Sequence, residues 1–181
     1  MNNERRKLPN ILITGTPGTG KTTLAQKICE EIQDLHYFNV GQVCKDKGLH
    51  EGMDEEFNSL IPDEDKIVDE LDPQMSLNDG GNVVDYHDCD FFPERWFDRV
   101  IVLRTDNTLL FDRLVARGYA ENKVQENIEC EIMQVLLDQA RDSYANEIVT
   151  ELTSDTVDDM DRNIDLVAQY VEAWKKENNN L

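Results

Sequence analysis

Basic residues are scarce in this chain of 181 residues. Its 18 lysines and arginines stand against 38 aspartates and glutamates, which gives a formal net charge of −20. A surface of this sign repels phosphate backbones and anionic membranes, so we expect no direct DNA or RNA binding and no binding to a membrane surface. The charge instead favours a basic protein as a partner.

Long apolar segments are also missing. No stretch approaches the roughly 18 apolar residues of a membrane span. The basic residues 5–7 lead straight into Leu8-Pro9 rather than into an apolar region. We therefore predict neither a signal peptide nor a membrane span, and we expect a soluble, intracellular protein.

Cysteine pairs at metal-binding spacing are absent as well. The four cysteines lie far apart and form no C-x-x-C pair, at positions Cys29, Cys44, Cys89 and Cys130. This spacing indicates neither a zinc knuckle nor a disulfide framework, so we expect reduced thiols.

With 39% hydrophobic residues and only 9 glycines and 5 prolines, the composition excludes a collagen-like or proline-rich chain. It is sufficient for one packed core, and residues 1–181 are predicted to form a single domain.

Short apolar runs alternate along the chain with segments of helical periodicity. The runs lie at 10–14, 37–40, 82–86, 99–103 and 148–152, and the helical patterns at 24–35, 67–71, 109–114, 122–144 and 160–174. Runs this apolar are typical of parallel strands covered on both faces, so the sequence predicts an α/β fold with a parallel sheet. Residues 51–72 contain ten acidic residues and one basic residue, and they are predicted to form an inserted, solvated segment at the sheet edge.

The first apolar run leads into a glycine-rich loop. Residues 15–22, GTPGTGKT, match the pattern G-x-x-x-x-G-K-[ST]. In such a loop the glycines let the backbone amides turn inward to cradle phosphate oxygens, and the following helix adds its N-terminal dipole. Lys21 would reach the β- and γ-phosphates as a point charge, and the Thr22 hydroxyl would be a ligand for magnesium. The loop therefore predicts a site for nucleotide phosphates.

Other motifs narrow the class of P-loop protein. Asp85 ends an apolar run, where an aspartate of P-loop proteins orients magnesium or its water shell. A GTPase is not expected, because the nearest match to N-K-x-D, at residues 122–125, lacks the aspartate. A motor or AAA-type ATPase would need a larger domain. A small phosphoryl-transfer enzyme or an ATP-driven switch remains.

Arginines near a predicted lid favour phosphoryl transfer, which needs cations around the migrating group. Arg113 and Arg117 are four residues apart and are predicted to share one helix face, with Gly118 as a hinge. The lid would deliver Arg117 to the ATP phosphates, and Arg104 would face the same edge of the sheet. The alternative is a solvated basic face.

The segment after Asp85 is more specific. Residues 85–87, DYH, and residues 89–97, CDFFPERWF, resemble the signature of the adenylate kinase isoenzyme 6 family, also called coilin-interacting nuclear ATPase. The similarity extends over about residues 8–175 and includes the segments 15–23, 63–72, 103–106, 117–119 and 127–132. It implies a P-loop NTPase fold with a five-stranded parallel sheet flanked by helices, as in adenylate kinases. It also implies a monophosphate-binding insert near 39–62 and a short lid near 116–126.

The resemblance implies roles for individual residues. ATP would be bound by Gly18, Gly20, Lys21, Thr22, Thr23 and Arg117. Catalysis would involve Lys21, Asp85, His87 and Arg117. Magnesium would be held by Thr22 and Asp85, partly through water. The nucleoside monophosphate would be bound by Lys45 and Arg95.

Two positions depart from the family pattern. Asp88 replaces a glycine, and a carboxylate there would alter the geometry of magnesium or water. Lys45 replaces an arginine that is common in the family, and lysine lacks the bidentate fork for phosphate. His87 is predicted to position a water or a phosphate, because the protonation of an imidazole is tunable near neutrality. The alternative for His87 is a structural histidine, whereas His36 and His50 are predicted to be surface residues.

The family resemblance implies a nucleoside monophosphate kinase that also hydrolyses ATP. It further implies a role in maturation of the small ribosomal subunit through a basic ribosomal protein, a location in nucleus and cytoplasm, and a monomer. An alternative is an ATPase switch that releases this basic protein and whose acceptor site is vestigial. A P-loop fold that only binds nucleotide is a third possibility, although Lys21, Thr22 and Asp85 are all present. The preferred monophosphate is open at this point.

Overall fold

A computed structural model of the protein describes residues 5–56 and 59–178 and confirms the predicted α/β class. Five parallel strands form one sheet in the order β2-β5-β1-β6-β7. They are β1 (Ile11–Thr14), β2 (His36–Asn39), β5 (Asn82–Asp85), β6 (Arg99–Arg104) and β7 (Val149–Thr153). Each strand coincides with one predicted apolar run. The central strands β5, β1 and β6 are largely buried, and a strand covered on both faces has little room for polar side chains, whereas the edge strands β2 and β7 are partly exposed.

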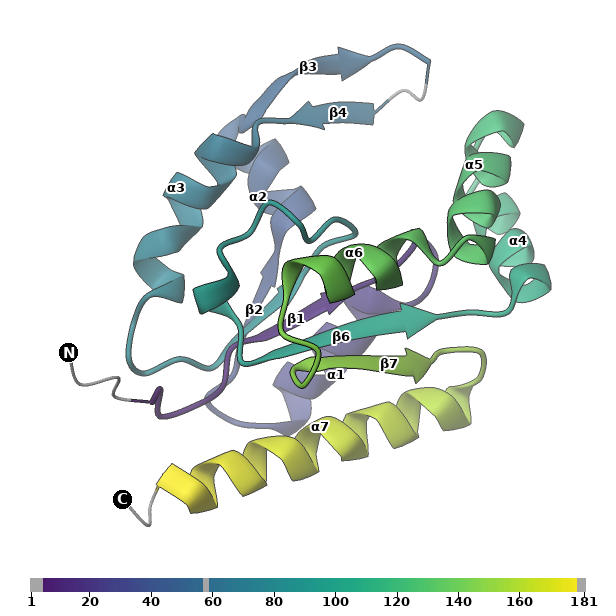
Figure 1. The fold of residues 1–181 in the computed structure, drawn as a ribbon. Coiled ribbons are helices and arrows are strands. Elements are labelled where there is room, and N and C mark those ends of the chain that lie inside the picture. Colours follow the sequence, from purple (N-terminus) through teal and green to yellow (C-terminus); the bar gives the residue numbers. More distant parts are fainter. Residues whose placement is uncertain (1–4, 57–58, 179–181) are drawn as a thin grey trace.

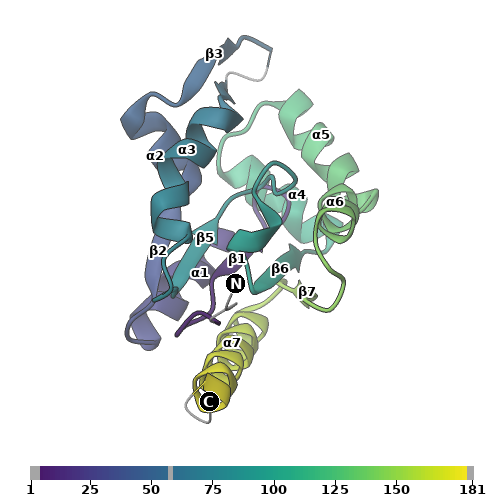
Figure 2. The ribbon, with the colours of Figure 1, turned by 60° about the vertical axis from the view of Figure 1, so that its left-hand side comes forward.

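Helices cover both faces of this sheet (Figures 1 and 2). They are α1 (Lys21–Glu31), α3 (Glu64–Met75), α6 (Val135–Ser143) and α7 (Val157–Asn178). Because side chains alternate along a strand, Ile11 and Ile13 pack with α1 and α7, whereas Leu12 packs with α3 and α6 on the other face. Among the described helices, none is both long and apolar enough to cross a membrane.

The region 39–62, predicted as an insert, stands above the sheet between β2 and α3 (Figure 1). It contains α2 (Val40–Lys47) and an antiparallel hairpin of β3 (His50–Asp54) and β4 (Ser59–Pro62). The side chain of Asn39 begins α2, because its Oδ1 accepts a hydrogen bond of 2.8 Å from the backbone amide of Gln42. His50 is half-buried, which corrects its prediction as a surface residue.

The predicted solvated segment 51–72 consists of two different structures. Its first half belongs to the hairpin, outside the main sheet. Its second half, from Glu64 onward, forms the first part of α3. This helix buries Ile67, Leu71 and Met75 in the core. These residues are four apart and therefore form one apolar stripe, while the acidic residues occupy the remaining surface of the helix. The prediction of a solvated segment is therefore wrong for this second half, whereas the helical pattern predicted at 67–71 is confirmed by α3.

Two further helices, α4 (Asn107–Ala116) and α5 (Glu121–Ile132), pack on each other beside the sheet (Figure 2). They share a small core of Leu110, Leu114 and Val124. The predicted single helix 122–144 is wrong, because the helical structure divides into α5 and α6. Gln134, between them, has a φ of 58°, a left-handed conformation that interrupts the helical hydrogen bonds and redirects the chain.

Candidate nucleotide-binding and phosphoryl-transfer site

A cavity of about 620 Å³ opens at the carboxyl ends of β1, β2 and β5. In open parallel sheets ligands bind at this edge, at the point where the strand order reverses. The glycine loop forms one side of the cavity, α2 and the hairpin form another, and α5 with the loop before it forms a third. Nine of the predicted site residues line the cavity: Gly18, Gly20, Lys21, Thr22, Thr23, Lys45, Asp85, His87 and Arg117.

Both backbone conformation and space require glycine in the loop. Gly15 has a φ of 140°, and a Cβ there would lie 2.6 Å from the backbone oxygen of Leu103. Gly20 has a φ of 96° and is the N-cap residue of α1. No side chain of the described residues caps this helix, so its first amide groups remain available to a phosphate at the cavity.

Lys21 is the buried cation of the loop. Its Nζ donates hydrogen bonds to the backbone oxygens of Gly15, at 2.7 Å, and Thr16, at 3.1 Å. Burial lowers the pKa of Lys21 to about 8, while the carboxylates of Asp85 and Glu131 act against this shift and Arg117 adds to it. Lys21 is therefore a protonated but poorly solvated cation at pH 7, and a phosphate group in the cavity would compensate its charge.

Asp85 is buried and surrounded by neutral hydrogen-bond donors. Its Oδ2 accepts from Thr22 Oγ1 at 2.6 Å, from Tyr37 Oη at 2.9 Å and from Asn39 Nδ2 at 3.2 Å. Asp85 forms no ion pair with any residue that the structure describes. A buried carboxylate without an ion pair favours a nearby cation.

The donor set around Asp85 fits magnesium. Carboxylate and hydroxyl oxygens, here those of Asp85 and Thr22, are the ligands that this ion prefers. No group of three or more His, Cys, Asp or Glu side chains in the described part of the chain is arranged to hold a metal. Magnesium commonly keeps several of its waters and is bound through one or two carboxylates together with substrate phosphates.

His87 lines the cavity. Its side chain is exposed to the open space of the cavity, and the cavity walls lie close to it. Partial desolvation together with the cations Lys21 and Lys123 lowers the pKa of His87 to about 4. Both causes act in the same direction, and His87 is therefore neutral at pH 7. This corrects the prediction that its protonation is tunable near neutrality. A neutral imidazole has one donor and one acceptor nitrogen, which suits it to orient a water or a phosphate oxygen.

The lowered pKa of His87 makes stability depend on pH. Between about pH 6.5 and pH 4 the unfolded chain binds a proton at this position and the native protein does not, so His87 lowers the stability as the pH falls. We expect the free energy of unfolding to fall less between pH 7 and pH 5 in His87→Gln than in the wild type. Urea unfolding of both proteins measures the difference, and an equal fall in both would show that the native pKa of His87 is ordinary.

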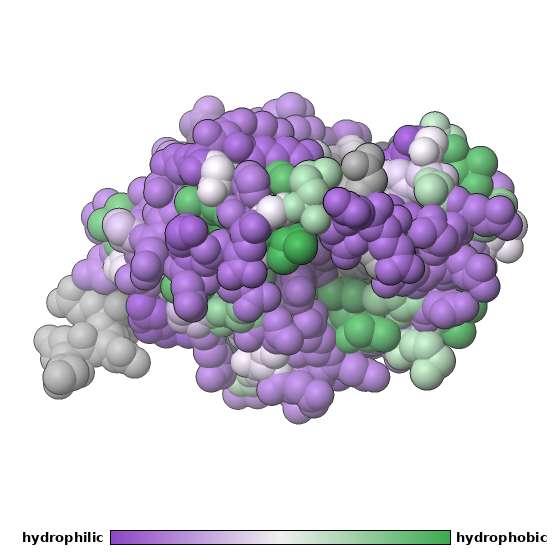
Figure 3. Space-filling view, turned by 90° about the horizontal axis from the view of Figure 1, so that it is seen from above, coloured by the Kyte–Doolittle hydropathy of each residue, from purple (hydrophilic) through white to green (hydrophobic). Residues whose placement is uncertain are grey.

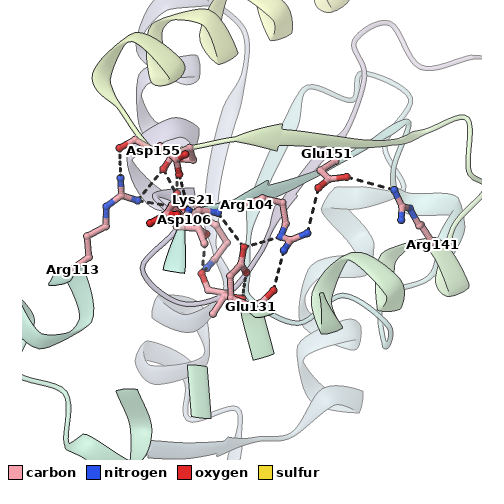
Figure 4. A network of polar contacts seen from close by, with 12 residues as sticks. Lys21, Arg104, Asp106, Arg113, Glu131, Arg141, Glu151 and Asp155 are labelled. Carbon is pink, nitrogen blue, oxygen red and sulfur yellow. Dashed lines mark hydrogen bonds and ion pairs between the residues drawn. The ribbon is translucent and has the colours of Figure 1, made fainter. Parts of the chain in front are cut away.

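The two arginines of the predicted lid have different surroundings. Arg117 is exposed and lines the cavity, and its guanidinium forms no hydrogen bond or ion pair with any described residue. Arg113 instead donates from its guanidinium to the backbone oxygens of Asp155 at 2.8 Å, Ser154 at 3.0 Å and Gly18 at 3.3 Å (Figure 4). The predicted shared face is therefore wrong. Arg117 is available to a ligand, whereas Arg113 joins α4 to the glycine loop and to the segment after β7.

Sequence reasoning missed Glu131, which lies buried near the end of α5. Its Oε2 accepts 2.6 Å from Thr16 Oγ1 of the glycine loop, and its Oε1 accepts 2.7 Å from Arg104 Nε. Arg104 also contacts Glu151, and it lies at the carboxyl end of β6, at the predicted edge of the sheet, but outside the cavity lining (Figure 4). From the sequence alone, an acidic residue on a helix is predicted to lie on the solvent-exposed face. The sequence carries no local signal for this pair.

Lys45 and Arg95, the residues predicted for the acceptor, lie in different places. Lys45 is on α2 and lines the cavity. Arg95 is in the 3₁₀ turn η1 (Glu94–Trp96), outside the cavity lining, and its Nη2 pairs with Asp72 Oδ1 of α3 at 2.5 Å. The structure therefore gives Arg95 a contact on the protein surface rather than the predicted contact with the monophosphate.

Asp88, the second departure from the family pattern, also lies outside the cavity lining. Its Oδ1 accepts hydrogen bonds from Gln139 Nε2 of α6, at 2.6 Å, and from the backbone amide of Cys89, at 2.9 Å. Burial and the neighbouring Asp90 raise the pKa of Asp88. The carboxylate thus holds α6 against the loop after β5, which corrects the expectation that it would alter the magnesium or water geometry.

A glycine loop with a buried lysine, an aspartate at the end of the neighbouring strand and an arginine on a separate helical pair define a P-loop kinase fold. The solved shikimate kinase of Bacteroides thetaiotaomicron shows the same fold, with a TM-score of 0.61 over 91% of this chain and 99% of that chain at 13% identity. A family profile described as "AAA domain" matches residues 11–134. This match corrects the argument that 181 residues are too few for a domain of that name.

Curated relatives match nearly the whole chain. The adenylate kinase isoenzyme 6 homolog of Dictyostelium discoideum is 51% identical over 98% of this chain and 99% of its own length. The homolog of the same name from Caenorhabditis elegans is 45% identical over 96% of this chain and 95% of its own length. The chain belongs to the adenylate kinase isoenzyme 6 family, as its motifs predict.

Proposed function

We propose that the protein is an ATP-dependent nucleoside monophosphate kinase, which transfers the γ-phosphoryl group of ATP to AMP or a similar monophosphate. The products would be ADP and a nucleoside diphosphate. One observation carries the proposal: Lys21, Asp85 and Arg117 face the same cavity as Lys45 on the insert helix. Groups suited to ATP phosphates and a cation suited to a second phosphate thus share one space.

The residues of this chain account for the transfer without a nucleophilic side chain, because an oxygen of the acceptor phosphate attacks. Lys21 and the amides at the start of α1 would bind the β- and γ-phosphates and stabilise the charge that develops there. Arg117 would approach the migrating group from the lid. Magnesium, held through Asp85 and Thr22, supplies charge neutralisation at these phosphates. Closure of the insert and the lid over the cavity would exclude water, which otherwise competes with the acceptor.

The test of the kinase proposal is diphosphate formation from ATP and magnesium with AMP, CMP, dAMP or no acceptor. We expect acceptor-dependent formation of ADP. In Lys45→Ala the KM for the acceptor should rise about tenfold or more with little change in kcat, because a charge-assisted contact to the bound phosphate is lost. Lys47→Ala is the matched control, since Lys47 lies on the same helix but outside the cavity lining and pairs with Glu70. ADP formation that none of the three monophosphates raises above the acceptor-free rate would contradict the proposal.

A second candidate function is an ATPase switch that acts in maturation of the small ribosomal subunit, in nucleus and cytoplasm, and releases a basic ribosomal protein. The net charge of −20 supports it. Figure 3 shows that the face seen from above is largely hydrophilic, with apolar residues scattered over it. In this role neutral His87 would orient the attacking water. Acceptor-independent phosphate release that is stimulated by a basic small-subunit ribosomal protein, and lost in His87→Ala, would favour the switch. Binding of that protein that weakens with added salt would show that the interaction is electrostatic.

A further inference from the structure

The amide side chain of Asn39 joins the acceptor side of the cavity to the carboxylate of Asp85. Its Nδ2 donates to Asp85 Oδ2 at 3.2 Å and to Tyr37 Oη at 3.1 Å. Its Oδ1 accepts 2.8 Å from the backbone amide of Gln42 and thereby caps α2. One rigid planar group therefore contacts both the first turn of the insert helix and the carboxylate beside the glycine loop.

Only an amide makes both contacts. Serine, aspartate and asparagine all accept a hydrogen bond as N-cap residues. Aspartate would place a second carboxylate against Asp85, and serine is too short to reach it while also capping the helix. The network also fixes the orientation of the amide, because the Gln42 amide is a donor and the Asp85 carboxylate is an acceptor. A cap alone would not require asparagine at this position.

The helix that Asn39 caps belongs to the acceptor side. Gly41, Cys44 and Lys45 of α2 all line the cavity. A monophosphate that contacts α2 would fix its first turn, and Asn39 sits at the start of that turn. The position of the Asn39 amide in turn sets one of the three hydrogen bonds that hold Asp85 Oδ2.

We propose that Asn39 is a positioning residue which couples acceptor binding on α2 to the Asp85 carboxylate, so that the acceptor and magnesium·ATP bind cooperatively. This inference rests on the proposed kinase function. Coupling between two sites is reciprocal, so either ligand should strengthen the binding of the other by the same factor.

Tyr37 provides a matched control. Its hydroxyl also donates to Asp85 Oδ2, at 2.9 Å, but it does not cap α2. Tyr37→Phe therefore removes this hydrogen bond and the one that Tyr37 Oη accepts from Asn39 Nδ2, but it keeps the Asn39–Asp85 contact and the cap of α2. Asn39→Ser removes the link and keeps a favourable cap, so its melting temperature should stay close to that of the wild type. Asn39→Gly is a second variant with a tolerated cap.

The experiment is a calorimetric titration with the magnesium complex of an imido-bridged, non-hydrolysable ATP analogue. It is done with and without saturating AMP, CMP or dAMP. For the wild type we expect the monophosphate to tighten analogue binding about fivefold or more. In Asn39→Ser and Asn39→Gly the ratio should fall to about one. In Tyr37→Phe binding should weaken in both conditions while the ratio persists.

The possible failures are distinguishable. A ratio in both Asn39 variants equal to that of the wild type would overturn the role of Asn39, and so would a wild-type ratio of one. Direct titration of the wild type with each monophosphate, in the absence of the analogue, tests the proposed function separately. Failure of all three monophosphates to bind would overturn the kinase proposal and the coupling with it.

Discussion

Replacing Lys21 with methionine is expected to lower ATP turnover on the order of a thousandfold, because the variant lacks the cation that stabilises charge on the transferred phosphoryl group. Methionine has a similar length and fits a buried position, so the loop keeps its packing. The effect should appear with and without a monophosphate acceptor, since both reactions use the same phosphate site. Coupled detection of ADP measures it in both conditions.

The same substitution is not expected to destabilise the protein. Burial lowers the pKa of Lys21 to about 8 in the native state, so the buried ammonium costs stability at pH 7. Methionine removes this cost but leaves the backbone oxygen of Gly15 without its hydrogen bond from Lys21 Nζ. The cost of an unpaired carbonyl, about 1–3 kcal/mol, is similar to the gain, so we expect little net change in the free energy of unfolding at neutral pH.

The pH dependence separates the two effects. The unfolded chain keeps its Lys21 proton up to about pH 10.5, whereas the native protein loses it near pH 8, so between these values wild-type stability rises with pH. Relative to the wild type, Lys21→Met should therefore lose on the order of 1–2 kcal/mol of stability between about pH 7.5 and pH 9.5. Lys27→Met, on the same helix but outside the cavity lining, is the control for both turnover and pH dependence. Normal turnover in Lys21→Met would contradict the assigned site.

The strands and the phosphate loop could be predicted because local sequence determines them. Each buried strand is a continuous apolar run, and the positive φ values of Gly15 and Gly20 need glycine at the positions that the motif reserves for it. Lys21 begins the helix that follows β1, and Asp85 is the last residue of β5, so both lie at the carboxyl edge of two neighbouring parallel strands. The core of the site follows from strand order alone.

The remainder of the site depends on contacts between residues far apart in the sequence. Glu131 and Arg104 are 27 residues apart and form a buried pair that no local pattern marks. The break between α5 and α6 is at Gln134, whose left-handed conformation is unusual for a residue other than glycine or asparagine. The helical periodicity continues through it and therefore predicts one helix. The hairpin β3–β4 lacks a two-residue Asn-Gly or Asp-Gly turn, which is the strongest local signal for such a structure.

Arg117→Met and Arg113→Met are expected to affect different properties of the protein, turnover in the first and stability in the second. Loss of Arg117 should lower turnover about a thousandfold, as for other arginines that stabilise a migrating phosphoryl group, with little change in stability. Loss of Arg113 should instead lower the free energy of unfolding by about 1–3 kcal/mol, because backbone oxygens lose their partners. Urea unfolding and ADP formation measured on both variants decide the matter. Arg117→Lys, which keeps the charge, should retain part of the turnover.

The end of α4 explains why two arginines at helical spacing separate in this way. The helix ends at Ala116, so Arg117 is its C-cap residue and Gly118 follows with a φ of 74°. This left-handed glycine terminates the helix and turns the chain toward α5. Arg113 remains on the helix, and its guanidinium donates to the backbone oxygen of Gly18 in the glycine loop. Arg117 lies at the turn and lines the cavity. An equal loss of turnover in both methionine variants would mean that the two arginines act together after all. An effect confined to Arg117 would assign the phosphate contact to the turn rather than to a basic helix face.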